Sequence, residues 1–427
     1  MSADRSHRPG AASVSDPADD SLRAQYERYP YPERDPRDER KRLFVGSPSH
    51  LREIDHWVFG AARPRSRPLR ALVAGCGTGD GAIMLATQLH QDGRPGEVVA
   101  IDRSATALGI ARARAEMRGL PNIRFERLSL AALPSPELGT FDYIDCCGVL
   151  HHLPDPLAAL RALEASLSPG GGMGLMVYAP HGRTGVYMLQ DALALLAPPE
   201  QAPEERLDAA RRVMRHLPGT AWLRHNQNFG DHLTGGDAGL YDLLLNPRDR
   251  AYDVPAFLAL LDGAGLEAAC LVEPAQYDPD LLLPDPRLRS RAAGLSWAER
   301  AALAEALAGN MNTHVAYAVR RGERPARPDP LHPDAVPVAR EMPAPVIAEQ
   351  MGLGGTLPLQ FGPLTVPLPM PVQAKAFLGL IDGERTVGAI AGILAGRGIE
   401  RGRFESWWAD SFRALEHANR ILLRPPA

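Results

Sequence analysis

The chain has 427 residues and a formal net charge of −4, from 47 Lys and Arg against 51 Asp and Glu. This length allows a full α/β domain and about one further module. The near balance of charge argues against a dedicated nucleic-acid binder, whose affinity would come from an excess of basic residues.

Cysteine usage and the apolar runs narrow the class further. The four cysteines, Cys76, Cys146, Cys147 and Cys270, form no C-x-x-C pair, so the sequence suggests neither a zinc site nor a disulfide framework, and we expect no metal. No apolar run reaches the roughly 18 residues of a membrane span, and no apolar segment follows a basic start as in a signal peptide. We therefore expect a cytoplasmic protein with no membrane partner.

Strand-like and helix-like segments alternate over the first half of the chain. The expected strands cover residues 70–75, 97–102, 123–129, 141–150 and 172–179. The expected helices between them cover residues 81–89, 105–119 and 155–171. Strands that alternate with helices in this way favour a parallel sheet with helices on both faces.

The alternation pauses after residue 180 and later resumes. Residues 181–250 are rich in His, Asn, Tyr and Gly and are interpreted as a helical insert. A helix is then expected over 254–266, a strand over 267–274 and a last strand over 313–321. The domain boundaries that we predict are a disordered tail at 1–20, an N-terminal helical flap at 21–64, a main domain at 65–321, a linker at 322–337 and a small unit at 338–427.

A cluster of glycines marks the end of the first expected strand. In "LRALVAGCGTGDGAIMLA" (69–86), an apolar run stops at Gly75, Gly77, Gly79 and Gly81 and then becomes helical. A bend without Cβ atoms lets the backbone approach a ligand closely and presents N–H groups near a helix N-terminus. Dinucleotides and S-adenosylmethionine both bind to such loops. The glycines alone do not separate the two, because Asp102 ends the next strand in either case.

The wider order of motifs resembles the class I S-adenosylmethionine-dependent methyltransferases. "VAGCGTGDGAIMLA", "VVAIDRSATALGIARARA", "IRFERLSLAALP" and "FDYIDCCGVLHHLPDPLAALRALEASLSPGGGMGLMVYA" stand in the family's order over about residues 65–180. The resemblance implies an α/β fold with a doubly wound, seven-stranded, Rossmann-like sheet and a reversed last strand, here 313–321. The expected fold also includes the helical insert and a small, mostly helical C-terminal unit. A short-chain dehydrogenase would need a Tyr four residues before a Lys, whereas Arg37 precedes Lys41 and Pro371 precedes Lys375.

The same resemblance implies S-adenosylmethionine as the cofactor and assigns its contacts. Loop residues would border the methionine part, Asp102 would hold the ribose hydroxyls, and Arg103 would lie beside the adenine. Ser129 stands where the family often has an Asp that reads the adenine, and the Leu130 backbone is the alternative contact. The complete set of expected cofactor residues is Gly75, Cys76, Gly77, Thr78, Gly79, Asp102, Arg103, Ser129, Leu130, Cys147 and Gly148.

Two short motifs supply candidates for the acceptor side. "QYERYPYP" (25–32) resembles a segment that precedes the cofactor fold in a bacterial subfamily of these enzymes. It is interpreted as a flap that excludes water or as a packed anchor, with Tyr26 and Tyr29 as substrate contacts and Tyr31 as a catalytic candidate. His151 and His152 follow the fourth strand. Either could act as a general base, or they could fill a helix cap and the pocket wall.

The insert supplies the remaining substrate candidates. "YDLLLNPRDRAYDVPAFLALLDGAGL" resembles a stretch of the same subfamily, and an arginine there could pair with an anionic group. The alternative is a helical lid whose polar groups satisfy its own backbone. The expected substrate contacts, apart from the flap tyrosines, are Tyr178, Asn228, Asp231, His232, Tyr241, Arg250 and Tyr252.

The C-terminal unit resembles small winged-helix-like peptide-recognition domains over "FLGLIDGERTVGAIA", with Thr386 expected to cap a helix. The alternative is a structural cap or a dimerisation element. The prediction is therefore a methyltransferase that acts on an O, N or C acceptor, with a small molecule as substrate. A peptide or protein acceptor, an inactive binding module that uses residues 338–427, and a homodimer are the alternatives left open.

Overall fold

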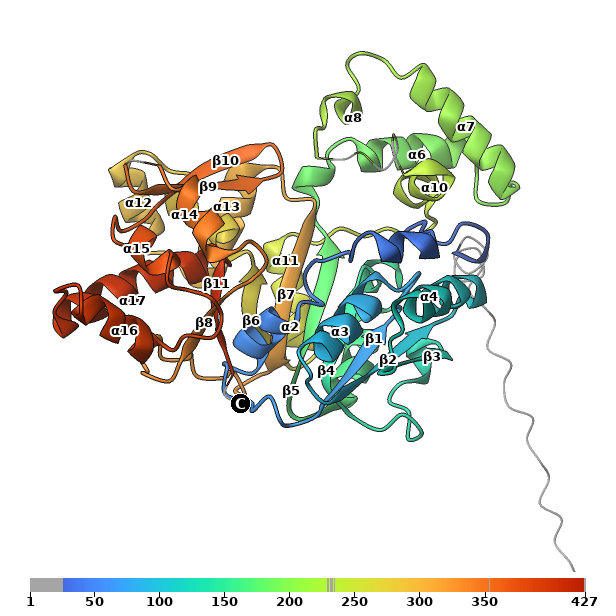
Figure 1. The fold of residues 1–427 in the computed structure, drawn as a ribbon. Helices are drawn as coiled ribbons and strands as arrows, with labels where there is room; N and C mark the ends of the chain where they lie inside the picture. Colours follow the sequence, from blue (N-terminus) through green and yellow to red (C-terminus); the bar gives the residue numbers. More distant parts are fainter. Residues whose placement is uncertain (1–25, 229, 231–232, 234, 353, 426–427) are drawn as a thin grey trace, which may run out of the picture.

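The computed structural model describes residues 26–228, 230, 233, 235–352 and 354–425. Its centre is a seven-stranded sheet in the order β3-β2-β1-β4-β5-β7-β6 (Figure 1). The strands are β1 (Leu69–Ala74), β2 (Gly96–Asp102), β3 (Ile123–Arg127), β4 (Phe141–Cys147), β5 (Leu167–Tyr178), β6 (Leu266–Val272) and β7 (Thr313–Arg320). Strands β3 to β5 pair in parallel, and β7 runs antiparallel to both β5 and β6. The predicted doubly wound sheet with a reversed last strand is confirmed.

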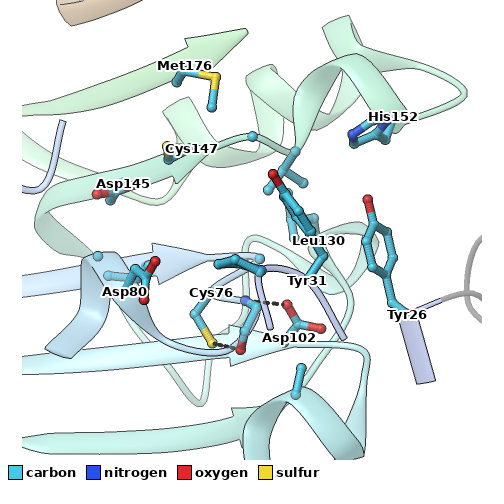
Figure 2. Close-up of a pocket in the computed structure, with 18 of the residues that line it drawn as sticks. Tyr26, Tyr31, Cys76, Asp80, Asp102, Leu130, Asp145, Cys147, His152 and Met176 are labelled. Atoms are coloured by element: carbon cyan, nitrogen blue, oxygen red, sulfur yellow. Dashed lines mark hydrogen bonds between the residues drawn. The ribbon is translucent and has the colours of Figure 1, made fainter. Parts of the chain in front are cut away.

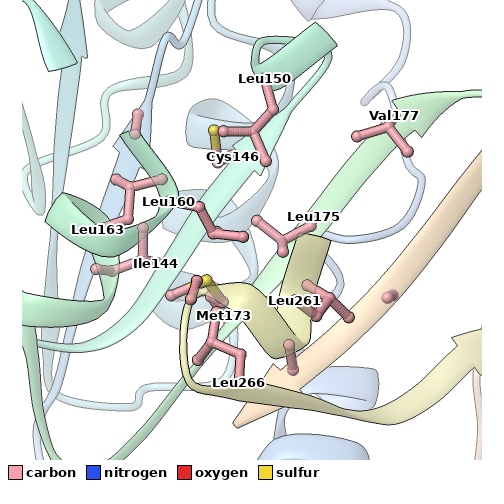
Figure 3. Close-up of a cluster of buried hydrophobic side chains, with 14 of the residues drawn as sticks. Ile144, Cys146, Leu150, Leu160, Leu163, Met173, Leu175, Val177, Leu261 and Leu266 are labelled. Carbon is pink, nitrogen blue, oxygen red and sulfur yellow. The ribbon is translucent and has the colours of Figure 1, made fainter. Parts of the chain in front are cut away.

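Helices cover both faces of this sheet. On one face α5 (Pro156–Ala165), α11 (Val254–Gly263) and α13 (Trp297–Ala308) pack on β4 and β5. Figure 3 shows Leu160 of α5 and Leu261 of α11 directed at the strand residues Ile144 and Leu175. On the other face lie α3 (Asp80–Gln91), α4 (Ala105–Arg118) and residues 51–59. Burial on both faces explains why the central strands are almost continuously apolar.

Side-chain caps set several helix starts that the sequence predicts. Ser104 accepts a hydrogen bond from the backbone N–H of Ala107 at the start of α4, and Asp155 does the same for Ala158 before α5. Helix α5 ends at Ala165, earlier than expected, because β5 begins at Leu167. The expected strand start at 172 lies inside β5, where the pairing with β4 shifts register next to Gly170 at φ 68°.

The insert stands over the carboxyl ends of the strands (Figure 1). It consists of α6 (Val186–Leu196), α7 (Pro203–Arg215), α8 (Trp222–His225) and α10 (Gly236–Leu245). Leucines of α6, α7 and α10 form a separate small core. The blue N-terminal segment passes between the insert and the sheet (Figure 1). Residues 26–49 therefore cover the carboxyl ends of the strands.

The C-terminal region, orange to red in Figure 1, lies beside β6. Its helices are α14 (Ala344–Gln350), α15 (Ala374–Leu378), α16 (Val387–Ala395) and α17 (Arg401–His417). Besides these it has two β-ribbons, β9 (Thr356–Phe361) with β10 (Leu364–Pro369), and β8 (Val336–Ala339) with β11 (Ile421–Arg424). Phe377, Phe404 and Trp408 form the centre of its core.

Buried polar contacts join the C-terminal region to α2 (Leu51–Glu53) and the turn that follows it. The N–H of Leu423 donates to His56 Nδ1 at 3.1 Å, so His56 Nε2 carries the hydrogen that bonds Glu416 at 2.8 Å. In the same layer Glu53 forms an ion pair with Arg340 and accepts a hydrogen bond from Asn419. Because the residues just before α2 reach the strand ends, the C-terminal region supports the part of the chain that lines the site. No helix in the described ranges has the length and apolar content to cross a membrane.

Candidate functional site

The glycine bend after β1 adopts backbone angles that other residues rarely take. Gly75, Gly77 and Gly79 have φ of 76°, 51° and 101°. A Cβ on Gly75 would lie 2.5 Å from Val149 Cγ2, and one on Gly79 would lie 2.9 Å from Ala111 Cβ. The bare chain here is therefore a requirement of both conformation and space.

Asp102, at the end of β2, fastens this bend. Its Oδ2 accepts the N–H of Gly77 and its Oδ1 accepts the N–H of Ser104, both at 2.8 Å. Burial raises the pKa of Asp102, and these backbone N–H groups oppose that rise. Figure 2 shows the Asp102 carboxylate beside the bend, at the side of the pocket. The N–H of Arg103 adds a third backbone hydrogen bond, so of the roughly four acceptor positions of a carboxylate one remains for a ligand.

A cavity of about 1360 Å³ extends from the bend to the insert. Small-ligand pockets usually measure about 300–1000 Å³, so this one has room for two ligands. Many residues expected from the sequence line it. They are Tyr26, Tyr31, Gly75, Cys76, Gly77, Asp102, Arg103, Ser129, Leu130, Cys147, Gly148, His152, Tyr178 and Asn228.

Other expected residues lie outside the lining. The Thr78 hydroxyl donates to the Pro32 carbonyl at 2.8 Å, and Gly79 caps α3. Tyr29 stacks on Tyr241 at 5.2 Å between ring centres, which places both in the core of the insert. Tyr252 belongs to the main core and Arg250 is exposed. His151 is buried against Tyr178 at 3.9 Å between ring centres. Asp231 and His232 lie outside the described residues.

The segment around Tyr26–Arg34 is bonded to the sheet domain by several charged contacts. Glu27 accepts the N–H groups of Ala105 and Thr106 at 2.8 and 3.2 Å, where the dipole of α4 favours a negative charge. Arg34 makes a two-pronged bond with Asp80, at 3.0 and 2.7 Å. Figure 2 shows the rings of Tyr26 and Tyr31 standing side by side with their hydroxyl groups toward the His152 side of the pocket.

A polar cluster occupies the insert end of the cavity. Asp242 of α10 accepts the Tyr26 hydroxyl at 3.0 Å and the Tyr178 hydroxyl at 3.3 Å. Asn246 adds a longer contact to the same carboxylate, at 3.4 Å. Burial raises the pKa of Asp242, whereas a protonated His152 and the Tyr26 hydrogen bond would lower it. His152 has its Nδ1 2.6 Å from the Arg248 carbonyl oxygen.

An acid in the interior of β4 also reaches the cavity. Asp145 Oδ2 accepts the hydroxyl of Ser49, and Oδ1 has no hydrogen-bond partner among the described residues. Burial raises the pKa of Asp145 to about 7. Its strand neighbour is Val73, two residues before the glycine bend. The described residues hold no group of three or more His, Cys, Asp or Glu side chains suited to a metal ion.

Sequence reasoning missed Asp145, Asp242, Arg34 and Asp80. Two of these acids had a usable signal, because Asp145 interrupts the apolar run "YIDCC" and Asp242 interrupts "LYDLLL". A charge in an otherwise buried element requires a partner or a function. Arg34 and Asp80 had no such signal, because each is an ordinary charged residue in a polar stretch.

Comparison with known proteins places this geometry in a family. A profile described as "Methyltransferase domain" matches residues 72–173. The uncharacterized protein syc1184_c of Synechococcus sp. is 32% identical over 327 residues, which cover 74% of each chain. The ubiquinone biosynthesis O-methyltransferase of Albidiferax ferrireducens is 33% identical over 102 residues, 24% of this chain and 38% of that one.

Solved structures share the fold over a longer stretch. PKMT2 from Rickettsia typhi superposes with a TM-score of 0.62 at 14% identity, covering 89% of this chain and 76% of that one. The structure of PKMT2 in complex with AdoHcy gives a TM-score of 0.59 at 13% identity, over 89% of this chain and 77% of that one. At these identities the likeness establishes the fold.

Proposed function

We propose that this chain methylates a small molecule held at the insert end of the cavity. It belongs to the class I S-adenosylmethionine-dependent methyltransferases, in one family with the Synechococcus protein. The observation that carries this proposal is the continuity of the cavity. One continuous cavity joins the glycine bend and Asp102 to the cluster of Tyr26, His152 and Tyr178. Its volume suits a cofactor and an acceptor together.

We assign the cofactor end to the bend and its neighbours. Asp102 has an acceptor position left for a ribose hydroxyl, as described above. Ser129 Oγ accepts the Ala131 N–H at 3.3 Å, so its own hydrogen can donate to an adenine ring nitrogen. The unpaired Oδ1 of Asp145 is suited to the ammonium group of the methionine part, because an opposite charge stabilises a buried carboxylate.

When bound, the cofactor supplies a methyl group that its sulfonium already activates, so the protein's main contribution is placement. Holding two reactants in line can supply about 7–11 kcal/mol of the barrier. Figure 2 shows Tyr31 between Asp102 and His152, and Tyr31 and Gly148 both line the cavity. The Arg34–Asp80 and Glu27–α4 contacts hold the N-terminal segment over the site and keep water out.

The small-molecule assignment is supported by the shape of the acceptor end. Tyr26 from the N-terminal segment, Tyr178 from β5 and Asp242 from the insert close around it through hydrogen bonds. The net charge of −4 gives no support to a nucleic-acid acceptor. The match to the ubiquinone biosynthesis O-methyltransferase of Albidiferax ferrireducens covers 24% of this chain and 38% of that one, so its acceptor is not carried over to this chain.

Transfer of a labelled methyl group into a cell extract tests the proposal. The extract is incubated with wild-type protein and labelled S-adenosylmethionine and then separated by size. We expect label in the small-molecule fraction with wild type, and a loss of that label with Asp102→Asn. Label in protein or RNA instead, or label that is equal with and without the enzyme, would reject a small-molecule acceptor.

A further inference from the structure

The acceptor end of the cavity faces its ligand with hydrogen-bond acceptors, and this limits the chemistry of the substrate. Resting on the function proposed above, we infer that the methylated group is an O–H or N–H nucleophile and that His152 Nε2 removes its proton. The inference comes from the hydrogen-bond inventory of Tyr26, His152 and Tyr178, which lie on three different segments and line one part of the cavity.

The tautomer of His152 follows from its backbone partner. Nδ1 lies 2.6 Å from the carbonyl oxygen of Arg248. A carbonyl oxygen only accepts hydrogen bonds, so Nδ1 must carry the hydrogen. In the neutral ring Nε2 then holds a lone pair. His152 sits in the short turn Leu150–His152, where the buried Leu150 and His151 fix the backbone, so the ring is held in this orientation.

The hydroxyl hydrogens of Tyr26 and Tyr178 are already donated within the protein. Each hydroxyl has a single hydrogen, and Asp242 accepts both, at 3.0 Å from Tyr26 and 3.3 Å from Tyr178. Asn246 also donates to Asp242, which keeps that carboxylate in its role as acceptor. Asn246 Nδ2 also donates to Tyr26 Oη, at 3.5 Å. Toward a ligand, Tyr26 Oη therefore presents its remaining lone pair and Tyr178 Oη presents its lone pairs.

These atoms are close enough to serve one functional group. The His152 ring centre is 6.5 Å from that of Tyr26 and 5.6 Å from that of Tyr178, in edge-to-face arrangements. A carboxylate, phosphate or thiolate would meet three lone pairs and the negative charge of Asp242 and would be repelled. A hydroxyl or amine can donate its hydrogen to any of the three atoms.

One positive charge beside this cluster, that of Arg183, is already paired. Arg183 lies over the Tyr178 ring at 3.8 Å from the ring centre. Its Nη2 donates to Asp249 at 2.6 Å and its Nε to the Tyr187 hydroxyl at 3.0 Å. Its charge is balanced by Asp249, so Arg183 does not turn the cluster into an anion site.

The proposed step balances as follows. The O–H or N–H bond of the acceptor breaks and its proton moves to His152 Nε2. The electron pair on the acceptor oxygen or nitrogen forms the new bond to the methyl carbon as the methyl–sulfur bond breaks, and that bonding pair stays on sulfur. The resulting imidazolium keeps its Nδ1–H bond to the Arg248 carbonyl and is stabilised by the nearby Asp242.

Nitrogen NMR of the histidine rings tests the inference without a known substrate. His152 is assigned by comparing ¹⁵N-histidine-labelled wild type with His152→Asn, whose side-chain N–H can keep the bond to Arg248. His216→Gln, at an exposed position in the insert, is the matched control. We expect hydrogen on Nδ1 and a lone pair on Nε2 in the AdoHcy-loaded protein. A ring with its hydrogen on Nε2 would overturn the inference.

Four probes of similar size then test the substrate class on the AdoHcy-loaded protein. Phenol and aniline carry a donor, whereas anisole and benzoate do not. We expect phenol or aniline to shift the His152 signal and to bind about tenfold or more tightly than anisole and benzoate, and this preference should weaken in His152→Asn. A benzoate or anisole response equal to that of phenol and aniline would overturn the inference. Failure of AdoHcy itself to bind would instead reject the proposed function.

Discussion

The two ends of the cavity are built in different ways. At the cofactor end the bend after β1 and Asp102 of β2 lie within about thirty residues and bond through the backbone. The acceptor end joins Tyr26, His152, Tyr178 and Asp242, which the chain order separates by up to 216 positions. A site made from local backbone suits a ligand that is always the same. In a site made from side chains of several segments, each contact can be altered by substituting one residue.

If the ends have separate roles, His152→Asn will stop transfer and leave cofactor binding intact. Loss of a positioned general base typically costs about 10²–10⁴-fold in rate. The measurement is the rate of labelled-methyl appearance in the small-molecule fraction, beside a calorimetric titration with AdoHcy. A rate within about threefold of wild type would show that His152 is not the base.

Gly75→Ala tests whether the glycine bend at the cofactor end depends on the absence of a Cβ atom. The new Cβ would lie 2.5 Å from Val149 Cγ2 at a φ of 76°, so we expect a loss of about 2–5 kcal/mol of unfolding free energy from strain and overpacking. Gly93→Ala is the control, because Gly93 has φ 59° and its added Cβ would meet no described heavy atom within 4 Å. Chemical denaturation compares the two, and equal losses would contradict the packing account of the bend.

The pH dependence of stability tests whether an ionised Asp145 carboxylate at the cofactor end opposes folding. Its pKa is raised to about 7 in the folded chain, so the folded state holds a proton that the unfolded state releases near pH 4. Stability from this group is present below pH 4 and is lost as pH rises toward 7. We expect the stabilisation of Asp145→Asn over wild type to grow by about 2–3 kcal/mol between pH 5 and pH 8.

Chemical denaturation of both proteins at the two pH values measures that difference. The comparison with wild type removes the contribution of other groups such as His50, whose pKa is lowered to about 4 by burial. A constant difference between the two proteins would mean that Asp145 ionises normally. An ionised Asp145 lowers the free energy of unfolding, and a bound ammonium group would offset this loss.

The contrast between the two ends also explains what the sequence could predict. The alternating strands and helices and the glycine bend follow from apolar periodicity, glycines and caps, which are local features, whereas the reversed strand and the expected cofactor contacts came from the resemblance to the methyltransferase family. Tyr29 and Tyr31 belong to the same aromatic run, yet Tyr31 lines the cavity and Tyr29 packs on Tyr241. Which ring turns inward depends on the insert, more than two hundred residues away, so no local pattern could separate them.

The partnership of Tyr26 and Tyr178 with Asp242 was beyond prediction for the same reason. The polar residues of the insert were expected to contact the substrate as a group, but Tyr241 is held by Arg206 and Arg250 is exposed to solvent. Asp242, adjacent to Tyr241, faces the cavity because α10 turns the opposite side toward its leucine core. The direction of a short helix in an insert depends on packing that periodicity does not specify.

The separation of the two ends is tested most directly by calorimetric titration of AdoHcy into wild type, Asp102→Asn and Asp242→Asn. Both substitutions remove one buried carboxylate from the same cavity. We predict about 10–100-fold weaker binding for Asp102→Asn, from the loss of charged hydrogen bonds, and a change within about twofold for Asp242→Asn. Equal effects of the two substitutions, or unchanged binding to Asp102→Asn, would contradict the account.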